Sequence, residues 1–281
     1  MMDMASIVIQ NIREFSTLPT VYSSLVDVLA DPKSTTQDVS NIISCDQAST
    51  TKVLKVVNSS FYGFSGQIDT ISRAIVILGF NEIYNLILAS YLIDFFSKKE
   101  AVLDFRPVDF WGHSIAVGIA SRLIGQTLGL PNPEHFFVTG VLHDIGKLVF
   151  FEFSEDQFAA ALALSKREQQ PLQTAEKTIF GMDHTETGAL IAERWRFPSS
   201  IKQAIRYHQA GIVPGKNDLL TAAVHLGNIL CRALELGYPG DDYIPQPNPQ
   251  VLEILNAQPS LLKKITPSLL KDYESTAQSL L

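Results

Sequence analysis

The stretch GVLHDIGK at residues 140–147 decides the fold, because it places His143 next to Asp144 in an apolar run about halfway along the chain. An imidazole nitrogen and a carboxylate oxygen both suit a divalent transition metal. Adjacent helix residues point about 100° apart, so this pair alone cannot complete a metal site. More histidines would have to come from other helices, and the chain supplies three candidates: His113, His184 and His208. The alternative is an ordinary polar pair near the end of a helix.

Composition indicates a globular protein whose net charge disfavours binding to nucleic acid. The 281 residues allow one large or two small domains, and the 46% hydrophobic and 18% charged residues exclude a disordered chain. The net charge of -7 comes without any sustained run of Lys or Arg. Non-specific binding to a phosphate backbone requires clustered cations, so nucleic acid is a disfavoured partner.

Cysteine usage and hydropathy predict a cytoplasmic protein with no membrane partner. Cys45 and Cys231 form neither a disulfide framework nor a CxxC motif, which indicates a reducing compartment. Residues 1–10 lack the basic and apolar regions of a signal peptide. The longest apolar stretch, residues 83–96, is interrupted by polar residues and is shorter than the roughly 20 residues that cross a bilayer.

Apolar residues recur at helical spacing along most of the chain, and no segment alternates polar and apolar residues as a half-buried strand does. The pattern therefore predicts an all-α fold. One helix is expected over residues 134–151, where it would carry the His-Asp pair. The tail from Gly237 is rich in prolines, so we expect it to be the least regular region, with short helices at 251–255 and 267–280.

The N-terminal half carries a specific set of motifs: Leu18-Pro19, IISCD at 42–46, KVLKVVNS at 52–59, FYG at 61–63, ISRAI at 71–75 and LG at 78–79. With the four histidines, they resemble the HDOD family, the HD-related output domain of bacterial signalling. That family is related to the metal-dependent phosphohydrolases of the HD superfamily. The resemblance runs from about Ile12 to about Leu230.

The resemblance implies an HD-like helical bundle with an additional N-terminal helical layer. The HDOD domain would cover residues 7–236, divided into the layer at about 7–105 and the bundle at about 107–236. Residues 237–281 would form a Pro-rich, helical C-terminal appendage.

Carried over residue by residue, the family's metal positions fall on His113, His143, Asp144, His184 and His208. Lys147 matches a lysine that could contact a bound phosphate. The implied cofactor is one or two divalent transition-metal ions, with iron, manganese, zinc and nickel as candidates.

Two departures from the catalytic members stand out. Asn228 occupies the place of a final aspartate ligand, and its neutral amide oxygen is a weaker donor than a carboxylate. Residues 209–216 are too short for the Gly-Tyr-Pro loop of the cyclic-dinucleotide phosphodiesterases. The literal Gly-Tyr-Pro at residues 237–239 comes after Asn228, so we interpret it as incidental. His225, one turn before Asn228, is an alternative ligand or a packing residue.

Two classes of function remain open. One is a regulatory module of bacterial signal transduction that acts through contacts with unidentified signalling proteins and has little or no catalysis. The other is a metal-dependent phosphohydrolase or phosphodiesterase, in which a metal activates water. The loss of the last acid and of the loop favours the first class and disfavours a cyclic dinucleotide ligand, so we assign no catalytic residue. A DNA-binding regulator is the least favoured class.

Overall fold

The computed structural model describes residues 4–14, 24, 25, 28, 33–44, 47–58, 66–97 and 99–280. Within these ranges the regular structure is helical, apart from isolated bridges at Val102–Phe105 and Val213–Lys216. The all-α prediction is therefore confirmed. Several motif residues, namely Leu18, Pro19, Cys45 and residues 61–63, lie outside the described part. No helix in that part is long and apolar enough to cross a membrane.

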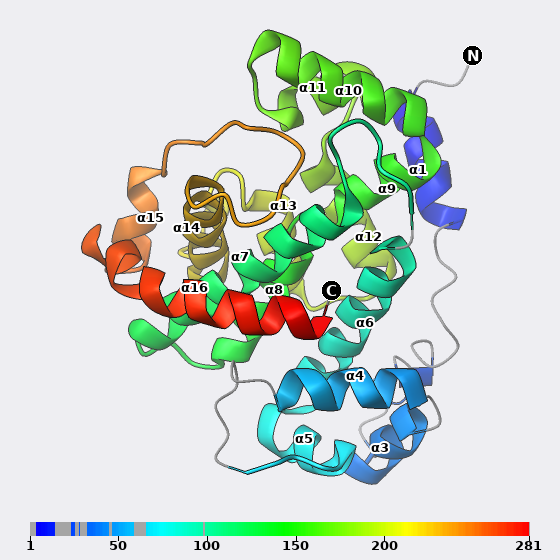
Figure 1. Ribbon diagram of the computed structural model, residues 1–281, viewed down its shortest axis with the longest axis vertical. Helices are drawn as coiled ribbons and strands as arrows, with labels where there is room; N and C mark the ends of the chain where they lie inside the picture. Colours follow the sequence, from blue (N-terminus) through cyan, green and yellow to red (C-terminus); the bar gives the residue numbers. More distant parts are fainter. Residues whose placement is uncertain are drawn as a thin grey trace. The chain divides into compact units, whose positions relative to one another are not determined.

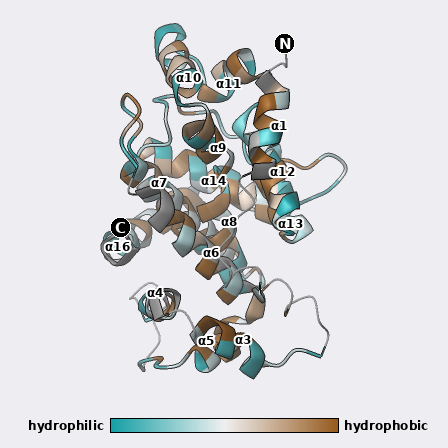
Figure 2. Cartoon of the chain, turned by 90° about the vertical axis from the view of Figure 1, so that its right-hand side faces the viewer, coloured by the Kyte–Doolittle hydropathy of each residue, from teal (hydrophilic) through white to brown (hydrophobic). Residues whose placement is uncertain are grey.

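Contacts divide the chain into two units, one of residues 1–16 and 99–269 and one of residues 17–98 and 270–281. Among the described residues, the second unit contains α3 (Thr36–Ser44), α4 (Gln47–Val57), α5 (Ile71–Leu78) and α6 (Phe80–Ser97), together with the second half of α16 (Ser260–Leu280). Figure 2 shows how strongly apolar α5 and α6 are. The motif residue Asn58 has a structural role here, because its amide bonds both the N–H and the carbonyl of Ile68 at 2.7 and 2.6 Å.

The larger unit contains the residues of the His-Asp stretch. Its helices are α1 (Met4–Glu14), α7 (Pro107–Thr127), α8 (Pro133–Leu142), α9 (Gly146–Phe153), α10 (Glu155–Glu168), α11 (Leu172–Phe180), α12 (His184–Arg194), α13 (Ser199–Tyr207), α14 (Leu219–Ala233) and α15 (Pro249–Ile254). The first half of α16 (Ser260–Leu280) also belongs to it. Figure 1 shows α7 among the other helices of this unit.

Helix α7 is the centre of this unit. It is apolar on nearly all sides and packs against α8 and α14, as expected for a helix that is buried all round. At its crossing with α8 the backbones touch: a Cβ on Gly118 would lie 2.7 Å from the carbonyl oxygen of Phe137, and one on Gly140 would lie 2.7 Å from the Cα of Gly118. Only glycine permits this approach, which sets His113 of α7 near the end of α8.

The prediction of one helix over residues 134–151 is wrong, because the chain forms two helices, α8 and α9, that meet at the His-Asp pair. The Nδ1 atom of His143 bonds the carbonyl oxygen of Gly140 at 2.7 Å, which occupies an acceptor that a continuing helix would use. The next turns are tightened: Ile145 N–H donates to Leu142 and Lys147 N–H donates to Asp144. A continuous apolar pattern conceals this break.

The tail prediction is correct for residues 237–248, which are irregular, but wrong for the last helix. Helix α16 begins at Ser260 and continues through Pro267. Leu261, Ile265 and Leu269 are buried at a spacing of four residues on either side of the proline. Burial of this apolar stripe therefore outweighs the helix hydrogen bond that Pro267 removes.

Candidate metal centre

Two histidines reach the centre from the C-terminal ends of helices. His143 is the C-cap of α8 and His208 is the C-cap of α13. In each, Nδ1 faces the carbonyl oxygen three residues earlier, that of Gly140 at 2.7 Å and that of Ile205 at 2.9 Å. Because only an N–H can donate to a carbonyl, this contact places the proton on Nδ1 and leaves the Nε2 lone pair for a ligand.

His184 reaches the centre from the first position of α12, where Asp183 and Glu186 form a capping box. The buried carboxylate of Glu176, on α11, accepts from both the backbone N–H and Nδ1 of His184, at 2.9 and 2.5 Å. The start of α9 lies directly against this turn, since a Cβ on Gly146 would lie 1.9 Å from the His184 carbonyl oxygen. Asp144 is thereby brought beside His184.

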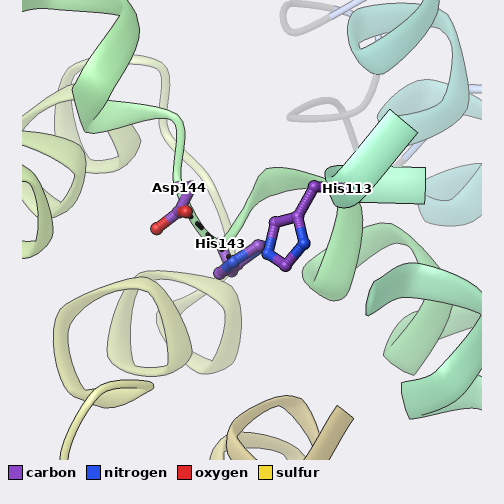
Figure 3. Close-up of side chains that lie close together, drawn as sticks. All are labelled: His113, His143 and Asp144. Atoms are coloured by element: carbon purple, nitrogen blue, oxygen red, sulfur yellow. Dashed lines mark ion pairs between the residues drawn. The ribbon is translucent and has the colours of Figure 1, made fainter. Parts of the chain in front are cut away.

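The structure brings the five sequence-predicted ligands together. They form two groups that share Asp144, each with ligand atoms within 4.8 Å of one another: His113, His143 and Asp144, and Asp144, His184 and His208. Figure 3 shows the first group, in which the His143 ring lies between the Asp144 carboxylate and the His113 ring, and the two rings are tilted by 59°. Asp144 Oδ1 lies 3.3 Å from Nε2 of His184 and 3.3 Å from Nε2 of His208, and Asp144 Oδ2 lies 3.3 Å from Nε2 of His143.

The buried atoms at the centre fit a cation. Among the described residues, Nε2 of His143, Nε2 of His208 and Oδ1 of Asp144 are buried without a hydrogen-bond partner. A buried polar atom left unpaired costs about 1–3 kcal/mol, so such atoms normally have a partner. Two imidazole lone pairs and a carboxylate oxygen are the donors that zinc, iron and nickel accept.

Asn228, at the place of the missing acid, also lies at the centre. Its Oδ1 is 3.0 Å from Nε2 of His113, and Arg232 Nε donates to the same oxygen at 3.2 Å. The other ring nitrogen of His113, Nδ1, faces the carbonyl oxygen of Leu236 at 3.3 Å. A neutral imidazole has one N–H and can donate to only one of these oxygens. If Nδ1 donates to Leu236, then Nε2 of His113 and Oδ1 of Asn228 are both acceptors, and together they could hold a cation.

Burial and neighbouring charge keep two imidazole rings of the centre neutral, which is the form that binds a metal. Burial, His143 and the cations Arg232 and Lys147 hold the pKa of His113 well below its usual value. Burial also lowers the pKa of His208, to about 3. Both rings are therefore neutral at pH 7.

Asp144 remains a carboxylate despite its burial. Burial opposes the charge, but His143, Lys147 and His184 outweigh it and hold the pKa well below its usual range. Lys147 is the formal cation in contact, with Nζ 2.5 Å from Oδ2 of Asp144. The centre therefore offers one charged oxygen ligand between the two histidine groups.

Two residues that the sequence did not single out, Glu176 and Pro239, contact the centre, and His225 does not join it. Glu176 gave a usable signal, because it lies on the buried face of α11 with Leu172, Ala175 and Phe180. Pro239 belongs to the Gly-Tyr-Pro tripeptide interpreted as incidental, yet its carbonyl oxygen accepts from Lys147 Nζ at 2.9 Å. His225 is outside both groups: its Nδ1 bonds the His208 carbonyl and its Nε2 accepts from Asn248.

Comparison with known proteins shows that most of the sequence matches one family. A sequence profile described as "HDOD domain" matches residues 15–211. A curated relative from Treponema pallidum (strain Nichols), named only as an uncharacterized protein, is 24% identical over 238 residues, covering 83% of this chain and 45% of that protein. The chain thus spans less than half the length of that relative.

Solved structures share the fold. An HDOD domain protein of unknown function from Geobacter sulfurreducens is 24% identical, with a TM-score of 0.75 and coverage of 98% of this chain and 99% of that one. A protein from Shewanella amazonensis SB2B, provisionally named a phosphohydrolase, is 24% identical, with a TM-score of 0.72 and 98% coverage of both chains. A protein from Marinobacter aquaeolei VT8, provisionally named a signal transduction protein, is 19% identical, with a TM-score of 0.71 and coverage of 94% and 59%.

Proposed function

The chain belongs to the HDOD family, and from this premise we propose that it is a metal-binding regulatory module of a bacterial signalling protein, acting through protein contacts rather than through turnover. One observation carries the proposal: the five ligand side chains are at most 1% exposed, and Lys147 is 0% exposed. A phosphoester needs a metal with an open coordination position. A centre closed on all sides binds its ion as a structural element.

The position of the centre suits a structural ion. Its ligands come from α7, from the turn between α8 and α9, from α12 and from the end of α13. An ion held by Asp144, His184 and His208 would join the turn between α8 and α9 to α12 and to the end of α13, and its binding energy would add to the stability of the fold. Loss or gain of the ion would then change how firmly the helices are held, which is a form of signal that a partner protein can detect.

The provisional names of the solved relatives from Shewanella and Marinobacter differ, one a phosphohydrolase and one a signal transduction protein. The second candidate function is accordingly a metal-dependent phosphohydrolase. It is favoured by the shared position of Asp144, because a carboxylate between two groups of histidines can bridge two ions. Asn228 counts against it, since an amide leaves a two-ion centre more positive and more weakly bound.

Elemental analysis together with activity assays tests the proposal. Protein would be equilibrated with iron, manganese, zinc or nickel, analysed for bound metal, and assayed on p-nitrophenyl phosphoesters and cyclic dinucleotides. We expect about one tightly bound ion and no turnover. His208→Gln should lose that ion, whereas the matched His135→Gln, on α8 and outside both groups, should keep it. Robust metal-dependent turnover by the unmodified protein would replace the regulatory module with the enzyme.

A further inference from the structure

The irregular segment Gly237–Tyr243, called the strap below, supplies oxygens to two buried cations. Lys147 Nζ donates to the Pro239 carbonyl at 2.9 Å. Arg232 donates through one terminal nitrogen to Asp241 Oδ1 at 2.7 Å and to the Tyr243 carbonyl at 2.8 Å. The strap thus gives the Lys147 ammonium one carbonyl oxygen, and it gives the Arg232 guanidinium one carbonyl oxygen and one carboxylate oxygen.

Both cations lie beside the metal centre. Lys147 is 0% exposed and also bonds Asp144, and Arg232 is 8% exposed and also bonds Asn228. Burial opposes the charge of Asp241, yet Arg232 and then Lys147 lower its pKa, so this carboxylate lies within the field of both cations. Buried cations without anionic partners are strongly unfavourable. Without the strap, this edge of the centre would carry an excess of positive charge.

We propose that the strap is the built-in occupant of an oxyanion site formed by Lys147 and Arg232, and that a phosphate-bearing ligand competes with it. A phosphoryl group presents several oxygens and a negative charge to the same two donors. The inference deepens the proposed function and rests on it, because it names the class of ligand that would reach the metal centre. Strap displacement then converts the closed centre into an open one.

The surroundings of the strap leave it room to move. Three cavities of about 410, 300 and 370 Å³ lie around it, and Asp241 and Tyr243 line all three. Two more hydrogen bonds hold the strap in place: Tyr238 N–H donates to Asp109 at 2.9 Å, and Leu172 N–H donates to Asp241 Oδ2 at 3.2 Å. Asp241 therefore takes part in two of the strap's attachments, and its loss should release the segment.

Asp241→Asn tests the strap, with Asp242→Asn as the matched control. The neighbouring Asp242 is exposed, so its substitution removes the same charge next to the attachment. We expect Asp241→Asn to bind inorganic phosphate about tenfold or more tightly than the unmodified chain and Asp242→Asn in calorimetric titration. The Tyr238 amide should also exchange hydrogen faster. Equal phosphate affinity and equal exchange in all three proteins would overturn the proposal.

A second pair of variants displaces the strap by steric clash. A Cβ on Gly237 (φ +69°) would lie 2.1 Å from the backbone nitrogen of His113, whereas one on Gly215 (φ +72°) would meet no atom within 4 Å. Gly237→Ala and Gly215→Ala therefore share backbone strain and differ in the clash. A gain in phosphate affinity confined to Gly237→Ala supports the strap, and the same affinity in both variants contradicts it.

All titrations would be made on the protein as purified and again after dialysis against a chelator, with bound metal measured in parallel. If the protein never binds metal but Asp241→Asn still binds phosphate more tightly, the proposed role of the strap is supported and the proposed metal centre is refuted. Normal metal content with no gain in phosphate affinity overturns the strap and leaves the metal centre intact.

Discussion

The two halves of the candidate metal centre share one carboxylate but differ in the charge around them. The His184 half consists of Asp144 Oδ1, His184 and His208, and the His113 half consists of Asp144, His113 and His143. In the His184 half, the Glu176 carboxylate accepts a hydrogen bond from His184 Nδ1, and Asp144 Oδ1 has no hydrogen-bond partner.

Two cations adjoin the His113 half instead. Lys147 bonds Asp144 Oδ2, and Arg232 bonds the oxygen of Asn228. Both cations contribute to the low pKa of His113. A positive ion should therefore bind first and more tightly in the His184 half. Two histidines in each half therefore do not make two equal sites, because the groups behind the ligands set the local charge.

The largest expected effect follows from Asp144→Asn, which removes the carboxylate from both halves at once. Metal affinity should fall by about 100-fold or more, and the unpaired buried Lys147 should cost about 3–5 kcal/mol of unfolding free energy. Equilibrium denaturation and elemental analysis measure the two losses. Asp156→Asn, an exposed carboxylate on α10, is the control and should change neither. Loss of only one of two bound ions would show that Asp144 does not serve both halves.

Glu176→Gln sharpens the comparison, since Glu176 acts only behind the His184 half. An amide can still accept from the His184 N–H but removes the negative charge, so affinity for the first ion should fall about 10–100-fold. Competition with a chromogenic chelator gives the affinity. Glu168→Gln, an exposed carboxylate at the end of α10, should leave it unchanged. An unchanged affinity in Glu176→Gln would mean that the groups behind the ligands do not control binding.

Asn228→Asp has the smallest effect of the three and acts on the other half. The added charge should raise affinity for a second ion about tenfold, because Arg232 is already close enough to share it. A two-step zinc titration would resolve the second event. If the first zinc ion binds more tightly and the affinity for the second does not change, the His113 half fills before the His184 half.

Side-chain chemistry made part of this centre predictable. His113, His184 and His208 could be selected as ligands with the His143-Asp144 pair because their side chains match motif positions, and Asn228 because it departs from one. The break between α8 and α9 could not, since a side-chain bond from His143 interrupts a pattern that stays apolar. The contact from Pro239 was hidden for another reason: a carbonyl oxygen is common to every residue and leaves no trace in the sequence.

Anomalous X-ray diffraction at the zinc absorption edge tests the central claim most directly. Crystals would be grown with about one equivalent of zinc per chain, so that the stronger half fills first. We expect one anomalous peak within bonding distance of Asp144 Oδ1, His184 Nε2 and His208 Nε2, with the site closed to solvent. A peak bound to His113 and Asn228 instead, or a zinc-bound water open to solvent in the His184 half, would contradict it.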